Sequence, residues 1–420
     1  TQDSVGKALG QLLAGTKFHR LVQSRGQQGI GACMKSDTLV PLADGRILTI
    51  KEIVDQNLVG DEALSLDLNS LKLVSGKISK CWKVKNPLFV SLRTQKGRKI
   101  LLTPENPVLV MNNGKLEWIR ADETQIGTKI GVPNKLFAFE SNSKRTIELF
   151  DENSIQVDEP ELMNEIKEKL AKKYDTISKT ASHFEIKKDR LRNWFTRKLK
   201  NNNPRGRPTL KALKKMAKEA GINENELLER ITRIGRNGTY SIIPKFIDKE
   251  TAWIAGLIAG DGHLSSQKDN KWGVNISLAS GNEKIADRFR EIIEQKFGLK
   301  TQKYFNEKKH YYTIQCSSKI LSEIFEYFGI TRGKKFDCFT LSNNLFTQTP
   351  EIIGGYLKGL FDAEGSASIE KRTISLTLYN KLALEQIFYA LLRLGIHANI
   401  NKQGNENRIT ITGKDNIYLF

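Results

Sequence analysis

Cysteine is scarce in this sequence, with four residues in 420, at positions 33, 81, 316 and 338. They form no CxxC pair or Cys/His cluster, which argues against a disulfide framework or a zinc site. No run approaches the roughly 18 consecutive apolar residues of a membrane span. The start of the chain has no basic segment followed by an apolar stretch, so no secretory signal is visible. These absences favour a reducing compartment, and we expect a cytoplasmic protein without membrane contact.

Acidic residues are outnumbered, at 47 Asp and Glu against 67 Lys and Arg, which gives a formal net charge of +20. This balance suits a polyanionic partner, and double-stranded DNA is the default expectation. A basic surface that is merely solvated is the alternative. The length, with 39 % hydrophobic residues, allows two to four domains.

One nine-residue motif occurs twice, as IAGLIAGDG at 254–262 and LKGLFDAEG at 357–365. Each copy is a helix-compatible run that ends in a carboxylate followed by glycine. Small residues recur at every fourth position, on one helix face, which predicts close backbone contact between two helices; they are Ala252, Gly256 and Gly260, then Gly355, Gly359 and Ala363.

Asp261 and Glu364 would then end two touching helices, because Gly262 and Gly365 are good helix stops. Two carboxylates held that close repel each other unless a divalent cation shares them. The alternative for Asp261 alone is an ordinary acid at a helix end. For the pair, the motif predicts a pseudo-twofold metal site.

The pattern after each motif also repeats, as strand, amphipathic helix and strand. We expect strands at 274–278, 311–315, 374–378 and 408–412, and helices at 283–297, 319–328 and 381–394. The paired motifs resemble the LAGLIDADG homing endonucleases of the dodecapeptide type, which commonly sit inside inteins. The resemblance runs from about Phe246 to the end, although Ala259 replaces the first Asp of the name motif.

This resemblance implies a monomeric, pseudo-twofold αββαββα domain at 248–420 that makes double-strand breaks in DNA. It assigns Asp261 and Glu364 as ligands of Mg²⁺, with the carbonyl oxygens of Gly260 and Ala363 as further ligands. Lys335, with Lys334 as second choice, would organise water or stabilise charge. A catalytically decayed, DNA-binding module is the alternative.

Residues 33–136 alternate apolar and polar residues in short runs, which predicts an all-β region. We expect strands at 38–42, 46–50, 77–84, 88–92 and 99–103. The stretch from Cys33 to Gly45 resembles the N-terminal splicing block of inteins, which have the horseshoe-shaped Hint fold, and 97–107 resembles their second block.

That resemblance implies protein splicing that begins when the Cys33 thiol attacks the carbonyl of Ala32. Thr103 would donate to the oxyanion. Asn106 stands where the family has a histidine, and an amide cannot be a general acid near neutral pH. The alternative for Cys33 is a small buried residue, which is our expectation for Cys81.

Residues 137–247 form a basic insert, in which 162–245 holds 22 Lys and Arg against 9 Asp and Glu. Helices at 166–174, 177–184 and 187–198 have helix-turn-helix spacing, with 189–198 as the recognition helix. We expect a flexible basic linker at 201–208 and a further helix at 211–220. Leu191, Trp194 and Phe195 would pack in the core, and His183 would be a helix-surface or packing residue and not a ligand. The residues expected to contact DNA are Arg190, Arg192, Arg197 and Lys198.

Residues 1–32 begin with an expected helix at 5–13 and continue into a glycine-rich loop that could approach a phosphate. The loop residues Gly26, Gln27, Gln28, Gly29 and Gly31, with the preceding text, resemble the nucleotide lid of the B subunit of topoisomerase VI. Residues 1–32 would thus be a short part of a host protein that the intein interrupts. Only the complete host topoisomerase would bind ATP and the A subunit. We expect a longer precursor, because the terminal splicing residues and the last helix of the second repeat are not seen before Phe420.

Overall fold

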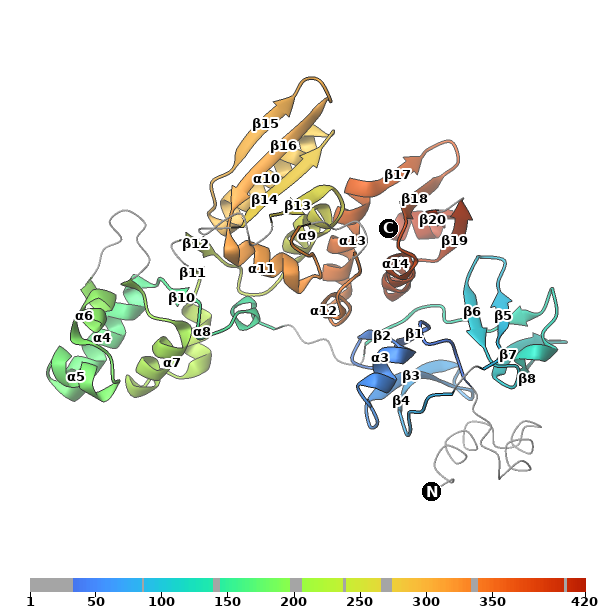
Figure 1. The fold of residues 1–420 in the computed structure, drawn as a ribbon, viewed down its shortest axis with the longest axis horizontal. Helices are drawn as coiled ribbons and strands as arrows, with labels where there is room; N and C mark the ends of the chain where they lie inside the picture. The colour runs from blue at the N-terminus through green and yellow to red at the C-terminus, as the bar shows by residue number, and fades with distance from the viewer. Residues whose placement is uncertain are drawn as a thin grey trace. The chain divides into compact units, whose positions relative to one another are not determined.

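The computed structural model describes residues 33–84, 87–138, 144–196, 206–236, 239–265, 274–333, 339–403 and 406–420 (Figure 1). The helix and loop expected within 1–32 lie outside these residues. The chain forms two compact units, Thr1–Asn142 with Thr340–Pro350 and Gly365–Phe420, and Ser143–Phe339 with Glu351–Glu364. Among the described residues, no helix has the length and apolar character needed to cross a membrane.

The first unit begins with antiparallel strands that follow the alternating sequence. They pair as β1–β2, β3–β4, β5–β6 and a three-stranded β8–β7–β9 sheet. Their bounds are β1 Leu39–Pro41, β2 Ile47–Thr49, β3 Glu62–Asp67, β4 Lys72–Lys77, β5 Val90–Arg93, β6 Lys99–Leu102, β7 Pro107–Asn112, β8 Lys115–Arg120 and β9 Lys129–Ile130, with a 3-10 helix η1 at Ala121–Glu123.

Two features of this region differ from expectation. The strand expected at 77–84 is wrong, because β4 ends at Lys77, where its partner β3 begins with Glu62. The alternation therefore continues past the last residue that has a strand partner. The region is also not wholly β, since helix α3 spans Ile50–Asp55. Thr49 and Glu52 form a capping box at its start, a signal that was present in the sequence.

The rest of the first unit is the second motif's strand and helix region. Its four-stranded sheet has the order β17–β18–β20–β19. The elements are α12 Asn343–Phe346, β17 Gly365–Ser368, β18 Thr373–Leu378, α14 Lys381–Arg393, β19 Ala398–Gln403, β20 Glu406–Thr412 and α15 Lys414–Leu419. The expectation that this repeat lacks its last helix is wrong, because α15 follows β20.

The second unit contains the first repeat and both motif helices. Its sheet has the order β13–β14–β16–β15, the same arrangement as in the second repeat. The elements are α9 Lys249–Asp261, β13 Gly262–Leu264, β14 Asn275–Ser280, α10 Glu283–Phe297, β15 Gln302–Asn306, β16 Tyr311–Ser317, α11 Lys319–Tyr327 and α13 Pro350–Glu364. Both repeats have the element order αββαββα.

The basic insert also lies in the second unit. It contains η2 Thr146–Leu149, β10 Gln156–Val157, α4 Pro160–Tyr174, α5 Ile177–His183, α6 Lys188–Thr196, α7 Leu210–Glu219, α8 Glu224–Arg230, β11 Arg233–Arg236 and β12 Thr239–Ile242. Leu191, Trp194 and Phe195 are buried, as expected. His183 stacks on Tyr174 with ring centroids 4.7 Å apart, which confirms a packing role.

Candidate functional sites

Helices α9 and α13 lie side by side and touch through their backbones (Figure 1). A Cβ atom on Gly256 would lie 2.1 Å from the carbonyl oxygen of Tyr356, and one on Gly355 would lie 2.4 Å from that of Lys249. Any side chain there would force the helices apart. The stripe of small residues therefore has the predicted role, and the lost helix propensity is offset by close packing.

This contact brings the two motif carboxylates to adjacent helix ends. A Cβ atom on Gly260 would lie 2.5 Å from Ala363 Cβ and 3.0 Å from Glu364 Cγ. Asp261 ends α9 and Glu364 ends α13, and both side chains are exposed. The paired acids predicted from the sequence are thus presented together to solvent.

Gly262 stops α9 for a different reason than the left-handed turn that often ends a helix. Its φ of −94° is ordinary, and the chain passes directly into β13. A Cβ atom on Gly262 would lie 2.5 Å from Ile258 Cα, so glycine is required by space. The direct passage into a strand fixes Asp261 as the last helical residue.

The first acid of the second motif, Asp362, has structural partners. Trp253 Nε1 donates a hydrogen bond to Asp362 Oδ2 at 2.8 Å, which links α9 to α13. Lys358 Nζ lies 3.1 Å from the same oxygen and 5.4 Å from the centre of the Trp253 ring. At the corresponding place in the first motif, Ala259 is buried. The two copies therefore differ beside their exposed acids.

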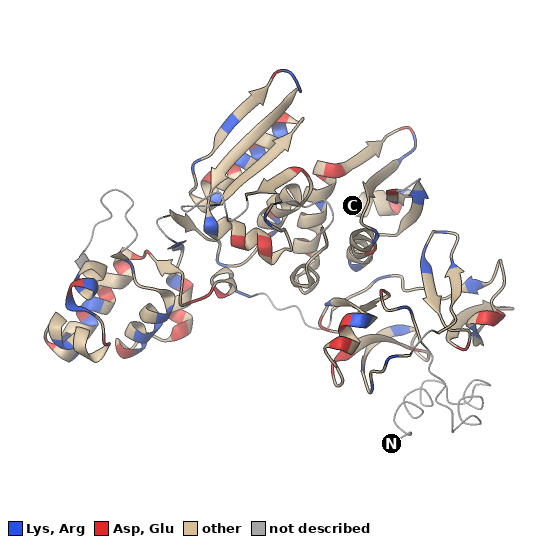
Figure 2. Ribbon diagram, in the orientation of Figure 1, with Lys and Arg blue, Asp and Glu red and all other residues tan. Residues whose placement is uncertain are grey.

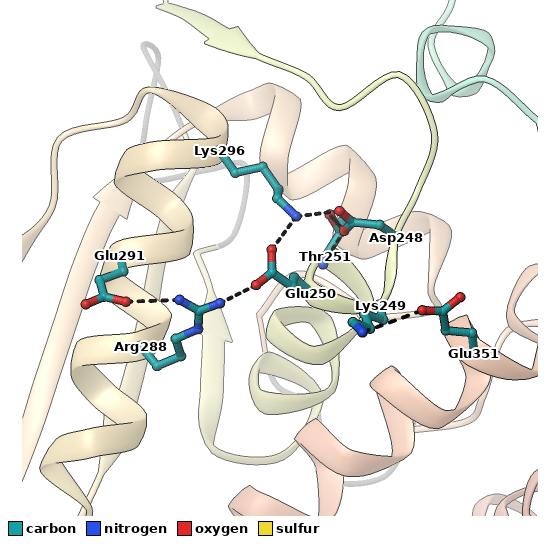
Figure 3. Close-up of polar contacts among 8 residues, drawn as sticks. All are labelled: Asp248, Lys249, Glu250, Thr251, Arg288, Glu291, Lys296 and Glu351. Atoms are coloured by element: carbon teal, nitrogen blue, oxygen red, sulfur yellow. Dashed lines mark hydrogen bonds and ion pairs between the residues drawn. The ribbon is translucent and has the colours of Figure 1, made fainter.

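A charged cluster fixes the other end of α9 (Figure 3). Asp248 caps the helix by accepting a hydrogen bond from the N–H of Thr251 at 2.9 Å. Lys296 of α10 donates to both Asp248 and Glu250, the latter at 2.7 Å. Burial alone would raise the pKa of Asp248, but the Lys296 and Thr251 hydrogen bonds outweigh it and lower that pKa. This cluster anchors the start of α9, at the opposite end from Asp261.

The carboxylates that end α9 and α13 are ligands of the type that a hard divalent cation takes. No group of three or more His, Cys, Asp and Glu side chains is arranged as a metal site within the described part of the chain. A pair of carboxylates with nearby carbonyl oxygens leaves coordination positions for water and phosphate, as Mg²⁺ prefers. Lys334 and Lys335 lie outside the described residues, but Gly333 donates its N–H to Leu264 O of β13 at 2.8 Å.

The structure adds polar residues that the sequence reasoning missed. His263 is exposed on β13, two residues after Asp261. In the second repeat, Ser366 of β17 shares a hydrogen bond with Ser375 at 3.0 Å, and Arg408 donates to Ser375 at 2.7 Å. The positions directly after each acid and glycine could have identified His263 and Ser366, whereas Arg408 required the strand register.

A second site gathers Cys33, Thr103 and Asn106 in the first unit. The Cys33 N–H donates to Thr103 Oγ1 at 3.1 Å, and the Thr103 N–H donates to Cys33 O at 2.8 Å. Asn106 Nδ2 donates to Cys33 O at 2.8 Å and to Thr103 Oγ1 at 2.9 Å. Thr103 and Asn106 are each only 4 % exposed. The predicted trio therefore forms one hydrogen-bonded network.

The Cys33 thiol is half-buried in this network. Burial raises its pKa, and the nearby Glu105 carboxylate raises it further. Trp82 acts in the opposite direction through a hydrogen bond. The thiol therefore stays protonated at neutral pH more completely than an ordinary cysteine. Cys81 is only partly buried and packs against the Leu42, Leu48 and Ile53 core, as expected for a packing residue.

The basic insert presents fewer available cations than its composition suggests. Figure 2 shows acidic and basic residues interspersed over α4 to α8. Arg190 lies over the Trp194 ring at 5.3 Å, and Arg192 lies 3.9 Å from Asp189, while Arg197 and Lys198 are outside the described residues. The ion pairs elsewhere on the insert include Lys169–Glu165, Lys173–Glu219, Lys214–Glu224, Arg230–Glu165 and Lys245–Glu229.

One end of the expected flexible linker is fixed. Arg207 is 5 % exposed and pairs with Asp158, 2 % exposed, at 2.6 Å. Arg233 lies 3.6 Å from the same carboxylate. Reading this residue as part of a flexible linker is therefore wrong, because its guanidinium is buried against an acid about 50 residues earlier in the chain.

Comparison with known proteins places two families on this chain. The family model described as "Intein splicing domain" matches residues 40–243, and that described as "LAGLIDADG-like domain" matches 248–329 and 351–420. The chain is therefore similar to intein splicing domains over the first range and to LAGLIDADG-like domains over the second. The first match extends over the basic insert as well as the β region.

Curated relatives carry diverse names. The glutamine–fructose-6-phosphate aminotransferase of Methanocaldococcus jannaschii is 28 % identical over 99 % of this chain and 36 % of its own length. Reverse gyrase of Thermococcus kodakarensis is 27 % identical over 85 % of this chain and 18 % of its own length. The chain thus spans about a third of the first relative's length and less than a fifth of the second's. Among solved structures, mesophilic variants of the homing endonuclease I-DmoI are 21 % identical over 41 % of this chain and 92 % of that chain, with a TM-score of 0.32.

Proposed function

We propose that this chain is part of an intein precursor with two activities, protein splicing that starts at Cys33 and cleavage of both strands of a DNA site. The observation that carries the nuclease is the pair of exposed carboxylates, Asp261 and Glu364, at adjacent helix ends. The relatives support an inserted element. Proteins with unrelated names match most of this chain, but the match covers only a minor part of each relative's own length.

The splicing centre would convert the Ala32–Cys33 amide to a thioester. Cys33 Sγ attacks the Ala32 carbonyl carbon, an S–C bond forms, and the C–N bond to Cys33 breaks. The thiol gives up one proton and the leaving nitrogen takes up one, so the step balances. Thr103 Oγ1 already accepts two hydrogen bonds, from Cys33 N–H and Asn106. Its own hydroxyl proton is therefore free to stabilise the oxyanion, the role expected for Thr103.

Asn106 would support this step without transferring a proton. Its amide donates to Cys33 O and to Thr103 Oγ1, and so fixes the plane of the Cys33 backbone and the rotamer of the threonine. The leaving nitrogen then takes its proton from water or from the attacking thiol. We expect a slower first step than a histidine would give.

The nuclease centre would use Asp261 and Glu364 to hold Mg²⁺ at the scissile phosphates. Divalent cations supply Lewis acidity there, which lowers the pKa of water and stabilises the leaving oxygen. Each acid would hold a cation for one strand, and the carbonyl oxygens of Gly260 and Ala363 would be further ligands. Lys335 is our proposed residue for orienting water.

DNA would lie on the polar strand faces, with α6 as an additional contact through Arg190 and Arg192. We propose the uninterrupted host gene as the DNA target. The glycine-rich sequence within residues 1–32 supports a topoisomerase VI B subunit as the host. ATP and the A subunit would bind only the spliced host. The nuclease would act as a monomer in the cytoplasm. The splicing region would have the horseshoe Hint fold.

The test of the nuclease uses the chain, Mg²⁺ and a plasmid that carries the joined host gene. Cleavage at one site, lost in Asp261→Asn and in Glu364→Gln but kept in Asp415→Asn on α15, would support the proposal. Tight binding without cutting by the unaltered chain would favour the alternative, a DNA-binding module. Cutting that survives both substitutions would overturn the assigned metal ligands.

The splicing step is tested separately with a reporter protein fused before Thr1. Thiol or hydroxylamine should release the fused segment by cleaving after Ala32, and Cys33→Ala should abolish release. Mass spectrometry identifies the new terminus. Absence of thiol-dependent release from the unaltered chain would remove the splicing half of the proposal.

A further inference from the structure

The hairpin that carries the second splicing block is docked on the second LAGLIDADG repeat. Ile400 of β19 donates its N–H to Lys96 O, in the turn between β5 and β6, at 3.0 Å. A Cβ atom on the next residue, Gly97, would lie only 1.6 Å from Ile400 O. Gly97 also has a φ of +83°, which closes the turn. The turn backbone therefore lies directly against the backbone of β19.

Helix α14 touches both splicing blocks through consecutive residues. The Arg98 guanidinium lies over the Phe388 ring, 4.9 Å from its centre, and burial lowers the pKa of Arg98. Tyr389 donates its hydroxyl to Leu39 O of β1 at 3.4 Å. Phe388 itself is 6 % exposed. One turn of α14 thus bridges the strand that follows Cys33 and the strand that precedes Thr103.

Further contacts extend this docking across the first unit. Asn343 of α12 accepts a hydrogen bond from the N–H of Ile47 at 3.0 Å. A Cβ atom on Gly45 would lie 2.6 Å from Phe346 O. Leu136 N–H donates to Leu392 O of α14 at 3.1 Å. These contacts make the second repeat part of the surroundings of both blocks.

The docked turn is linked to the splicing centre by one short strand. β6 runs from Lys99 to Leu102, and Thr103 is the next residue. Lys35, two residues after Cys33, donates its N–H to Leu101 O at 3.0 Å. Leu102 is buried in the core with Val108, Val110 and Ala121. A shift of the turn along the strand axis therefore moves Thr103 relative to Cys33.

We propose that the second LAGLIDADG repeat is a positioning element of the splicing centre. β19 and α14 fix the β5–β6 turn, and β6 carries that constraint to Thr103 and Asn106. The inference rests on the proposed splicing step at Cys33. It assigns Gly97, Arg98 and Phe388 as positioning residues that act through Thr103.

The test measures thiol-dependent release of a reporter fused before Thr1, as a rate constant and an amplitude. Gly97→Ala should lower the rate constant by about tenfold or more, with the amplitude kept, because small misplacements are costly to reaction geometry. Gly114→Ala is the matched control, since this glycine also has a positive φ, +77°, at a hairpin turn but has no atom within 4 Å of its added Cβ. We expect a change of less than about twofold there.

A double-mutant cycle tests the link from the side of the endonuclease. Arg98→Ala and Phe388→Leu should each slow release. The double variant should be no slower than the slower single variant, because both substitutions remove the same contact. Arg98→Lys should recover part of the rate by restoring a cation over the ring.

Three results would overturn the inference. The first is equal rate constants for Gly97→Ala and Gly114→Ala. The second is a lower amplitude with an unchanged rate constant in Gly97→Ala, which would report partial unfolding only. The third is additive effects of Arg98→Ala and Phe388→Leu in the double-mutant cycle. Failure of the unaltered chain to release the reporter would instead reject the splicing step itself, and the inference with it.

Discussion

Gly359 and the carbonyl oxygen of Trp253 meet in the contact between α13 and α9, where a Cβ atom on the glycine would lie 2.0 Å from that oxygen. The space between the two helices is therefore set by the absence of a side chain. Since the two acids follow a few residues later, this spacing also sets the distance between the proposed metal ligands.

Gly359→Ala should destabilise the protein by about 2–3 kcal/mol despite the better helix propensity of alanine, because the added methyl overpacks the contact. Thermal or urea unfolding measures this. Gly281→Ala serves as the control, because no atom lies within 4 Å of its added Cβ. Equal free energies of unfolding for the two variants would show that the close contact at Gly359 does not destabilise the alanine variant.

Asp362→Asn should retain DNA cleavage within about threefold, because an amide oxygen can still accept the Trp253 indole N–H. Asp362→Ala should lower stability by about 1–2 kcal/mol through the unpaired indole. Cleavage rates and melting curves separate the two effects. If Asp362→Asn is as inactive as Glu364→Gln, Asp362 is a ligand rather than a link between the helices.

Glu105→Gln should accelerate thiol-dependent release at neutral pH by about two- to fivefold. The Glu105 carboxylate raises the pKa of Cys33, so its removal lowers that pKa and increases the thiolate fraction below it. In both proteins the rate should rise with pH until it passes the Cys33 pKa, where the two profiles converge.

The pH profile is measured for both proteins from neutral to alkaline pH. Glu117→Gln is a matched control, because Glu117 lies on β8 and bonds Asn112 instead. A profile that is unchanged in Glu105→Gln would show that burial alone sets the reactivity of Cys33.

Arg207→Met should cost about 3–5 kcal/mol, because it leaves the buried Asp158 carboxylate without its partner. The change should also loosen the start of α7, two residues after the linker. Lys179→Met removes an exposed pair with Asp175 and should leave the melting temperature unchanged. Similar melting temperatures for the two variants would mean that the Asp158–Arg207 pair contributes no more than a surface pair.

Arg190→Ala should weaken DNA binding and reduce the salt dependence of binding by about one counterion, if α6 contacts phosphates. Lys169→Ala is the control, since Lys169 pairs with Glu165 on α4. Fluorescence anisotropy across a salt series gives both quantities. Identical salt slopes for the two variants would exclude α6 from the DNA contact.

Periodicity predicted the helices of both repeats well. α10 spans Glu283–Phe297 as expected, because Asn282 caps its start and Gly298 ends it with a left-handed φ of 62°. The short strands β13 and β17 were missed, since strands of three or four residues directly after a helix show too little alternation. The end of the strand expected at 77–84 depended on where its partner β3 begins, which no local pattern reports.

The candidate sites were predicted unevenly for a similar reason. Asp261 and Glu364 follow from a repeated motif and a stripe of small residues, which are local signals. The Cys33 network joins residues 70 and 73 positions apart, and resemblance alone brought them together. Nothing near Phe388 in the sequence indicates a cation above its ring, and nothing near Arg207 indicates a buried acid partner, because both depend on tertiary contacts.

The direct passage from α9 into β13 at Gly262 leaves the chain no slack at the carboxylate. An α-helix turns by about 100° per residue, so one inserted or deleted residue before Asp261 would point its side chain away from Glu364. The following strand, held in register with β14, could not rotate to compensate. This junction can therefore accept substitutions but not insertions or deletions. The number of residues between the small-residue stripe and Asp261 is as constrained as the identity of Asp261.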